Sequence, residues 1–170
     1  MTMAARKKQA EKCVEDDFTM SWMLNAPRER VFRAWTEPEE LKQWWGPRMF
    51  TTPVARIDLR PGGKYFNCMR APDGKDYCST GEFREVVAPE KLVYTDSFSD
   101  GQGNPVDPAK YGISADWPRE ALVDVTFAEQ NGMTKVTVHS HVPRSLAERQ
   151  MAPQGWAESL VKLAEYLEKK

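Results

Sequence analysis

The sequence lacks several features that mark common functional classes. Its formal net charge is −1, so it has no basic excess of the kind that nucleic-acid-binding proteins usually carry. It has no apolar run near the roughly 18 residues that a membrane-spanning helix needs. The charged N-terminus has no apolar segment behind it and therefore does not match a secretory signal. We expect no nucleic-acid partner, no membrane span and a cytoplasmic location.

Cysteine is scarce, and its spacing matches no metal-binding motif. The three cysteines are Cys13, Cys68 and Cys78. An odd number suits a reducing compartment better than a disulfide framework. Cys68 and Cys78 lie on strands that flank a turn at Asp73-Gly74, close to opposite one another, but we expect free thiols.

Histidine is scarcer still, and recognisable catalytic motifs are missing. His139 and His141, the two histidines, share one face of a predicted strand. The sequence alone names no third ligand, so we expect both to face solvent and predict no metal site. Gly101-Gln102-Gly103 lacks the Lys-Ser/Thr of a phosphate loop, and no Gly-x-Ser-x-Gly, His-Glu-x-x-His or Cys-x-x-Cys motif occurs. We predict no cofactor.

Aromatic residues, by contrast, are plentiful. The 170 residues include six Trp, seven Phe and five Tyr, with 41% hydrophobic and 29% charged residues overall. This length and composition are typical of one globular domain. Aromatic side chains bury large areas in cores and line ligand pockets, so their excess points to one or both of these uses.

Hydrophobic periodicity predicts an α+β order of elements. Residues 1–13 are expected to form a flexible charged tail, and 14–170 a single domain. The predicted order is a strand over 14–24, helices over 27–36 and 36–45, strands over 53–59, 64–70, 77–87 and 91–98, a long loop over 99–118, a hairpin over 120–142 and a C-terminal helix. Thr36 is a candidate helix cap, and Pro153 is expected to break the C-terminal helical region.

The hairpin gives the most specific local prediction. Asn131-Gly132 is a strong signal for a two-residue type I′ turn. That turn pairs Phe127 with Val136 on an apolar face and Asp124 with His139 on the opposite face. The C-terminal helix in turn carries an apolar stripe that begins at Trp156, so it is expected to cover the buried face of an antiparallel sheet.

Several short stretches resemble a known family. They are 25–35 (NAPRERVFRAW), 39–47 (EELKQWWGP), 61–63 (PGG), 81–83 (GEF), 89–95 (PEKLVYT) and 155–156 (GW). With this order of elements they resemble the helix-grip fold of the START-like (SRPBCC) superfamily. Within it the chain looks like bacterial homologues of the activator of heat-shock-protein-90 ATPase. The resemblance covers about residues 15–168.

The resemblance implies a β-α-α-β6-α fold, with a curved antiparallel sheet wrapped around the long C-terminal helix and a cavity between them. The superfamily includes lipid carriers, hormone receptors, polyketide cyclases and co-chaperone modules, so the fold alone does not decide the function. The candidate ligand-binding residues are Trp44, Phe50, Tyr65, Asn67, Met69, Phe83, Tyr94, Phe98, Trp117, Trp156, Leu160 and Leu163.

Two orientations remain open in the sequence. Trp44 and Trp45 point about 100° apart on a helix, so one packs in the core and the other is half exposed or rims the cavity. On the strand over 64–70, either Tyr65, Asn67 and Met69 face inward, or Phe66 and Cys68 do.

Three functions compete. The favoured hypothesis is binding of a small hydrophobic or amphipathic molecule, with the 99–118 loop as a lid. The second is a cyclase- or hydrolase-type enzyme in the same cavity, with Asp96, Asn67, Tyr94 and Glu82 as its weak candidates. The third is a co-chaperone-like module that contacts a chaperone ATPase. Exposed Tyr111, Ile113 and Trp117 on the long loop would also suit a homodimer contact.

Overall fold

Strand β1 (Asp17–Leu24) opens the part of the chain that the computed structural model describes, residues 17–169. Its alternate residues are apolar, and Phe18 and Leu24 are buried. Helices α2 (Arg28–Thr36) and α3 (Pro38–Leu41) follow it directly, as predicted. The expected tail over 1–13 lies outside the described residues.

Helix α3 is shorter than the predicted 36–45, and Thr36 does not cap it. The Thr36 hydroxyl instead donates to the carbonyl oxygen of Phe32 at 2.8 Å, one turn back in α2. Because this bond uses the hydroxyl hydrogen and points the side chain into α2, no side-chain cap forms at the start of α3.

Six further strands complete one antiparallel sheet. They are β2 (Thr51–Ile57), β3 (Lys64–Arg70), β4 (Asp76–Val87), β5 (Lys91–Ser99), β6 (Ala121–Gln130) and β7 (Met133–Pro143). The strand order is β1-β7-β6-β5-β4-β3-β2, so β1 closes the edge beside β7 and β2 forms the other edge. The long loop between β5 and β6 contains one 3-10 turn, η1 (Pro108–Tyr111).

The β6–β7 hairpin has the predicted register. Phe127 lies opposite Val136, and Asp124 lies opposite His139. Asn131 and Gly132 both have positive φ, 54° and 78°, as a type I′ turn requires. The valine face is buried and the histidines lie on the other, convex face, where the side chains of His139 and His141 remain 33% and 39% exposed.

Two helices end the chain, α4 (Arg144–Arg149) and α5 (Ala152–Glu168). The break between them is at Met151, whose φ of 61° is left-handed, rather than at the predicted Pro153. Pro153 lies in the first turn of α5. Backbone N–H groups in the first turn have no partner within the helix, so a proline there costs no hydrogen bond.

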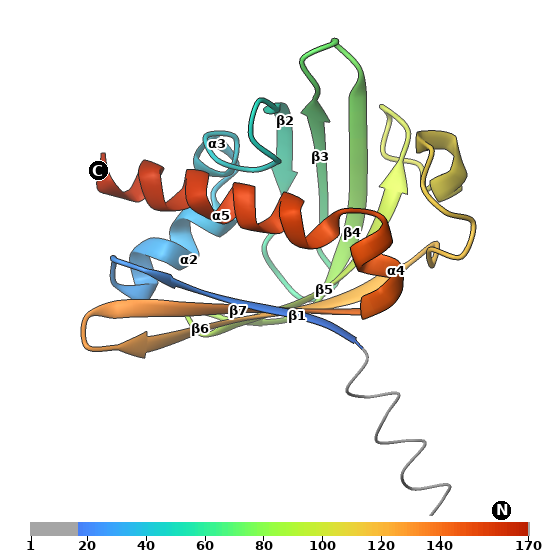
Figure 1. Cartoon of the computed structure of the whole chain (residues 1–170). Helices are drawn as coiled ribbons and strands as arrows, with labels where there is room; N and C mark the ends of the chain where they lie inside the picture. Colours follow the sequence, from blue (N-terminus) through green and yellow to red (C-terminus); the bar gives the residue numbers. More distant parts are fainter. Residues whose placement is uncertain (1–16, 170) are drawn as a thin grey trace, which may run out of the picture.

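Helix α5 crosses the concave side of the sheet (Figure 1). Leu160 and Leu163 are buried there in one cluster with Val125, Phe127 and Val136 of the hairpin. The chain therefore has the predicted helix-grip fold, with its main core between the sheet and this helix. Within residues 17–169, no helix combines the length and apolarity needed to cross a membrane.

Candidate functional site

A pocket of about 500 Å³ lies between the concave face of the sheet and helix α5. Strands β3, β4 and β5 form its floor, and α5 with the loops around residues 45–50 and 111–117 forms its other walls. Met151, at the break between α4 and α5, lines the pocket and is 60% exposed, so the pocket reaches the surface there. Most of its lining side chains are apolar or aromatic.

One end of the pocket is walled by tryptophans. Trp35 from α2 and Trp156 from α5 are stacked, with ring centroids 6.2 Å apart. Trp45 stands edge-on to Trp156 at 5.3 Å. These rings present a rigid apolar surface of the kind that binds rings and hydrocarbon chains.

A small polar cluster lies on the strand floor. The Tyr65 hydroxyl donates to Oδ1 of Asp96 at 2.7 Å. Asn67, two residues along β3, is 4% exposed, and its Oδ1 has no hydrogen-bond partner among the described residues. Such an acceptor can receive a hydrogen bond from a polar group on a bound molecule.

Burial changes the acidity of this cluster. Removal from water raises the pKa of the Asp96 carboxyl, although the hydrogen bond from Tyr65 partly opposes the effect. Burial, reinforced by the nearby Asp96 charge, raises the pKa of Tyr65 well above its ordinary value and also raises that of Tyr94. Asp96 is the single charged side chain among the described pocket residues, so the pocket itself holds no metal-ligand set.

Glycine at position 81 leaves room for the Tyr65 ring. A Cβ atom at Gly81 would lie 2.5 Å from Cε1 of Tyr65 and 1.8 Å from the carbonyl oxygen of Thr95. Any side chain there would therefore displace the backbone of β5 or the Tyr65 ring.

Lys162 of α5 holds the loop at the tryptophan end of the pocket. Its Nζ lies 3.1 Å from the carbonyl oxygen of Gly46, 3.3 Å from that of Pro47 and 3.2 Å from that of Phe50. Burial lowers the pKa of this amine, and the neighbouring Arg48 charge lowers it further. The contacts fix the loop that carries Trp45 and Phe50 against the helix.

The long loop between β5 and β6 turns its apolar side chains inward. Tyr111, Ile113 and Trp117 line the pocket and are only partly exposed. They do not form the exposed patch expected for a homodimer contact.

Nine of the twelve candidate residues line the pocket: Phe50, Tyr65, Asn67, Met69, Phe83, Tyr94, Phe98, Trp117 and Trp156. The inward alternative for Tyr65, Asn67 and Met69 is therefore the correct one.

Trp44, Leu160 and Leu163 lie in the core behind the pocket instead. Trp44 is fully buried, and its indole N–H donates to the carbonyl oxygen of Ala34 at 3.0 Å. Both tryptophans lie beyond the end of α3, so helical geometry did not predict which one faces the pocket. Trp45 takes that position.

Sequence reasoning missed several lining residues besides Trp45, among them Trp35, Tyr77, Ser79 and Ser159. The alternation of side chains along a strand was enough to predict the lining residues of β4. Counting back from Phe83 in steps of two places Ser79 and Tyr77 on the same inward face. No comparable signal marks Ser159, whose hydroxyl donates to the carbonyl oxygen of Gly155 within α5.

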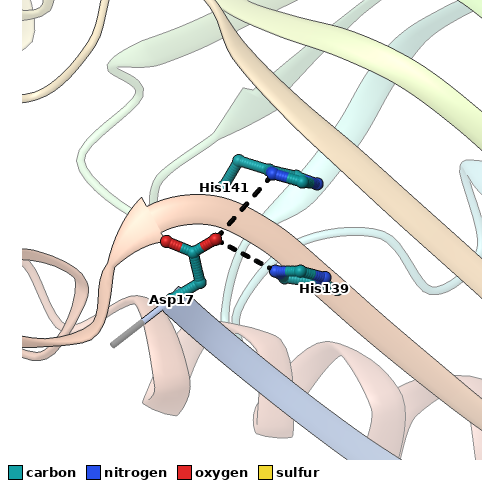
Figure 2. Close-up of side chains that lie close together, drawn as sticks. All are labelled: Asp17, His139 and His141. Atoms are coloured by element: carbon teal, nitrogen blue, oxygen red, sulfur yellow. Dashed lines mark hydrogen bonds and ion pairs between the residues drawn. The ribbon is translucent and has the colours of Figure 1, made fainter. Parts of the chain in front are cut away.

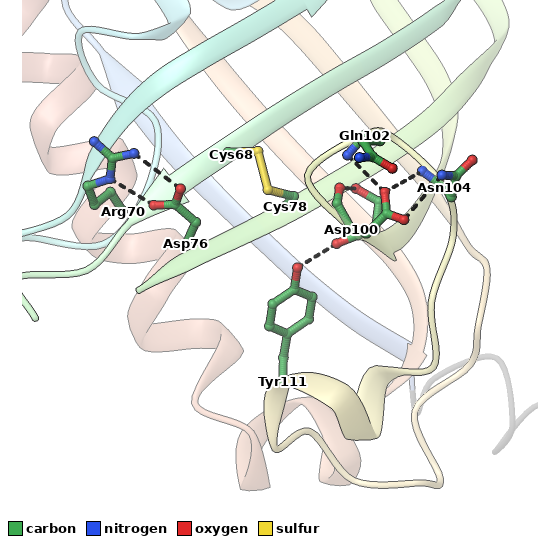
Figure 3. The surroundings of a disulfide bond; sticks show 9 residues. Cys68, Arg70, Asp76, Cys78, Asp100, Gln102, Asn104 and Tyr111 are labelled. Carbon is green, nitrogen blue, oxygen red and sulfur yellow. Dashed lines mark hydrogen bonds and ion pairs between the residues drawn. A yellow bond between two sulfur atoms is a disulfide. The ribbon is translucent and has the colours of Figure 1, made fainter. Parts of the chain in front are cut away.

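Cys68 and Cys78 form a disulfide between β3 and β4, where free thiols were expected (Figure 3). The register places the two residues directly opposite one another. Both are buried, at 5% and 2% exposure. The sequence placed the two residues close to opposite one another, but the odd number of cysteines favoured free thiols, and that expectation was wrong.

Comparison with known proteins gives a consistent result. Residues 25–168 match the sequence profile of the Activator of Hsp90 ATPase homolog 1-like protein family. A crystal structure of a protein from Nitrosomonas europaea is 26% identical, covers 91% of this chain and 96% of its own, and has a TM-score of 0.75. One from Mycobacterium smegmatis is 28% identical, with coverages of 87% and 85% and a TM-score of 0.69. Comparison with curated proteins gives no match.

Proposed function

This chain belongs to the Activator of Hsp90 ATPase homolog 1-like family, and from that premise we propose that it binds a small hydrophobic or amphipathic molecule between the sheet and α5. The observation that carries the proposal is the pocket of about 500 Å³. Pockets that hold small organic ligands usually span about 300–1,000 Å³ and combine apolar walls with a few polar groups.

The two ends of the pocket support a particular orientation of the ligand. Its apolar part would lie against Trp45 and Trp156. A hydroxyl or amine group would point to the floor and donate to Oδ1 of Asn67, whose acceptor has no partner among the described residues. Asp96, held by the Tyr65 hydroxyl at 2.7 Å, would provide a second contact for the same group.

Mass spectrometry gives the first test. The protein is purified without added ligand and compared under native and denaturing conditions. The proposal expects a bound small molecule that is lost on denaturation, or, if the protein is empty, binding of the apolar probe anilinonaphthalene sulfonate with quenching of tryptophan fluorescence. The absence of both a bound molecule and probe binding would contradict the proposal.

A matched pair of variants tests whether the probe binds in the pocket. Ser79→Trp adds an indole to the inward face of β4, while Glu82→Trp adds the same group to the outward face of that strand. We expect Ser79→Trp to weaken probe binding by at least about tenfold and Glu82→Trp to leave it within about twofold, because only the first fills the pocket. Equal affinities in the two variants would show that the probe binds elsewhere.

A second candidate is an enzyme of the cyclase or hydrolase type that uses the same pocket. Asp96 favours it, because an acidic group whose pKa is raised by burial can act as a general acid or base. Once a ligand is identified, Asp96→Asn separates the two functions. An enzyme would convert the ligand in the parent and lose turnover in the variant, whereas a carrier would release the ligand chemically unchanged from either protein.

The proposed compartment is the cytoplasm, and the disulfide between Cys68 and Cys78 is the observation that opposes it, because disulfides are rare in that compartment. Trapping thiols with N-ethylmaleimide at the moment of lysis measures the reduced fraction. A pair that is oxidised in most chains would contradict this compartment.

A further inference from the structure

Four side chains that can bind a metal or support its ligands gather on the convex face, away from the pocket. His139 and His141 are two residues apart on β7, so both project to the same side of the sheet. Asp17 begins the edge strand β1, which pairs with β7. Asp124 lies opposite His139 on β6. Three strands therefore contribute to one cluster.

Three of these residues lie close together, and the two imidazole rings, stacked with centroids 4.3 Å apart, would have to rotate for both to bind one ion. One ligand atom from each of Asp17, His139 and His141 lies within 4.8 Å of the others. Nε2 of His139 lies 3.2 Å from Oδ2 of Asp17, and Nδ1 of His141 lies 3.8 Å from the same oxygen (Figure 2). Asp17 is the third ligand that the sequence alone did not name.

Asp124 lies beside the opposite ring nitrogens. Its Oδ2 is 2.9 Å from Nε2 of His141 and 3.9 Å from Nδ1 of His139. When a histidine binds a metal through one nitrogen, the other N–H is commonly held by a carboxylate, which fixes the tautomer and the ring orientation. Asp124 stands where that supporting carboxylate is needed.

The charge of the cluster also favours a divalent cation. In residues 17–169, neither Asp17 nor Asp124 forms an ion pair with a lysine or an arginine; their ionic contacts are with the two histidines. With both imidazoles neutral, a divalent ion would balance the two carboxylates.

We propose that Asp17, His139 and His141 bind one Zn²⁺ ion, with Asp124 as the supporting carboxylate. Two imidazoles and a carboxylate suit Zn²⁺ better than Mg²⁺ or Ca²⁺, which prefer sets of oxygen ligands. The side chains are half-buried, so water reaches the fourth position of a tetrahedral site. The ion joins the edge strand β1 to β7 and stabilises the folded state by binding it.

Calorimetric titration of the full-length, tag-free protein with ZnCl₂, after removal of metal with a chelator, tests the proposal. All proteins carry Cys13→Ser, so that this thiol does not compete for the ion. We expect one Zn²⁺ per chain and a higher melting temperature in its presence. An absence of binding at about 100 µM Zn²⁺ would overturn the proposal.

Variants then locate the ion. His139→Gln/His141→Gln and, separately, Asp17→Asn should weaken binding by at least about tenfold, and Asp124→Asn should weaken it by about tenfold with the stoichiometry unchanged. The control Ser21→Ala/Thr137→Ala removes a hydrogen bond between the same two strands and should bind Zn²⁺ like the parent. Circular dichroism verifies that each variant folds, and parental affinity in both ligand variants would overturn the proposed site.

Discussion

The side chain of Asn67 carries a buried polar atom that should cost stability in the unliganded protein. It is 4% exposed, and its Oδ1 has no partner among the described residues. A buried polar atom that loses water without gaining a hydrogen bond costs free energy in the unliganded protein. A ligand that donates a hydrogen bond would recover that energy.

Replacing Asn67 with leucine should therefore stabilise the unliganded protein. We expect Asn67→Leu to raise the free energy of unfolding by about 1 kcal/mol, because a side chain of similar size replaces an unpaired polar group. Tyr65→Phe is the matched comparison. It removes a hydroxyl that is already hydrogen-bonded to Asp96, and should lower the free energy of unfolding by about 1 kcal/mol. Urea denaturation measures both, and a loss of stability in Asn67→Leu would contradict the prediction.

Asp96 gives the protein a predictable pH dependence. Because burial raises its pKa in the folded state, the unfolded state releases this proton more readily. The resulting destabilisation is absent below the ordinary aspartate pKa of about 3.9 and grows as the pH rises towards the folded-state pKa. Asp96→Asn should thus be more stable than the parent at pH 7, and the difference should disappear near pH 3. Urea denaturation across this range measures it, and a difference independent of pH would exclude the mechanism.

At the scale of elements, local signals predicted the fold well. Asn131-Gly132 set the register of the β6–β7 hairpin, and that register placed Asp124 opposite His139. The same local signals could not predict contacts that depend on tertiary geometry. Asp17 joins the histidine cluster because β1 pairs with β7, at a sequence distance where no periodicity connects the residues. Trp45 faces the pocket because α3 ends at Leu41, earlier than its apolar pattern suggested.

The disulfide between β3 and β4 should stabilise this pair of strands. It closes a loop with a sequence separation of 10 residues, and restricting an unfolded loop of that size is worth about 2–3 kcal/mol. We expect a reductant to lower the free energy of unfolding by about that amount in the parent and to have no effect on Cys68→Ser/Cys78→Ser. Urea denaturation with and without reductant gives the comparison, and equal stability of the oxidised and reduced parent would contradict it.

At the scale of the whole molecule, the sheet separates the two proposed sites. The pocket lies on its concave side beneath α5, and the histidine cluster lies on its convex side. Neither set of side chains includes a member of the other. Ligand binding and Zn²⁺ binding should consequently be measurable independently, so failure of one proposal would not decide the other.

We expect ligand access to depend on the loop between β5 and β6, whose Tyr111, Ile113 and Trp117 line the pocket. Asp107 holds this loop without touching the pocket. Its carboxylate accepts a hydrogen bond from the backbone N–H of Ala109 at 2.9 Å and pairs with Arg119 at 2.9 Å. A molecule must displace the loop both when it enters the pocket and when it leaves. The loop should therefore affect the association and dissociation rates more than the dissociation constant.

Asp107→Ala should accordingly speed both the association and the dissociation of anilinonaphthalene sulfonate by about threefold, with the dissociation constant unchanged within about twofold. Stopped-flow quenching of tryptophan fluorescence measures both rates. Asp116→Ala is the control, since Asp116 is an exposed aspartate of the same loop that does not line the pocket. If Asp107→Ala changed the affinity while the association rate stayed constant, the loop would be part of the binding surface and would not act as a lid. Rates equal to those of the parent would mean that the probe passes beside Met151, at the exposed break between α4 and α5.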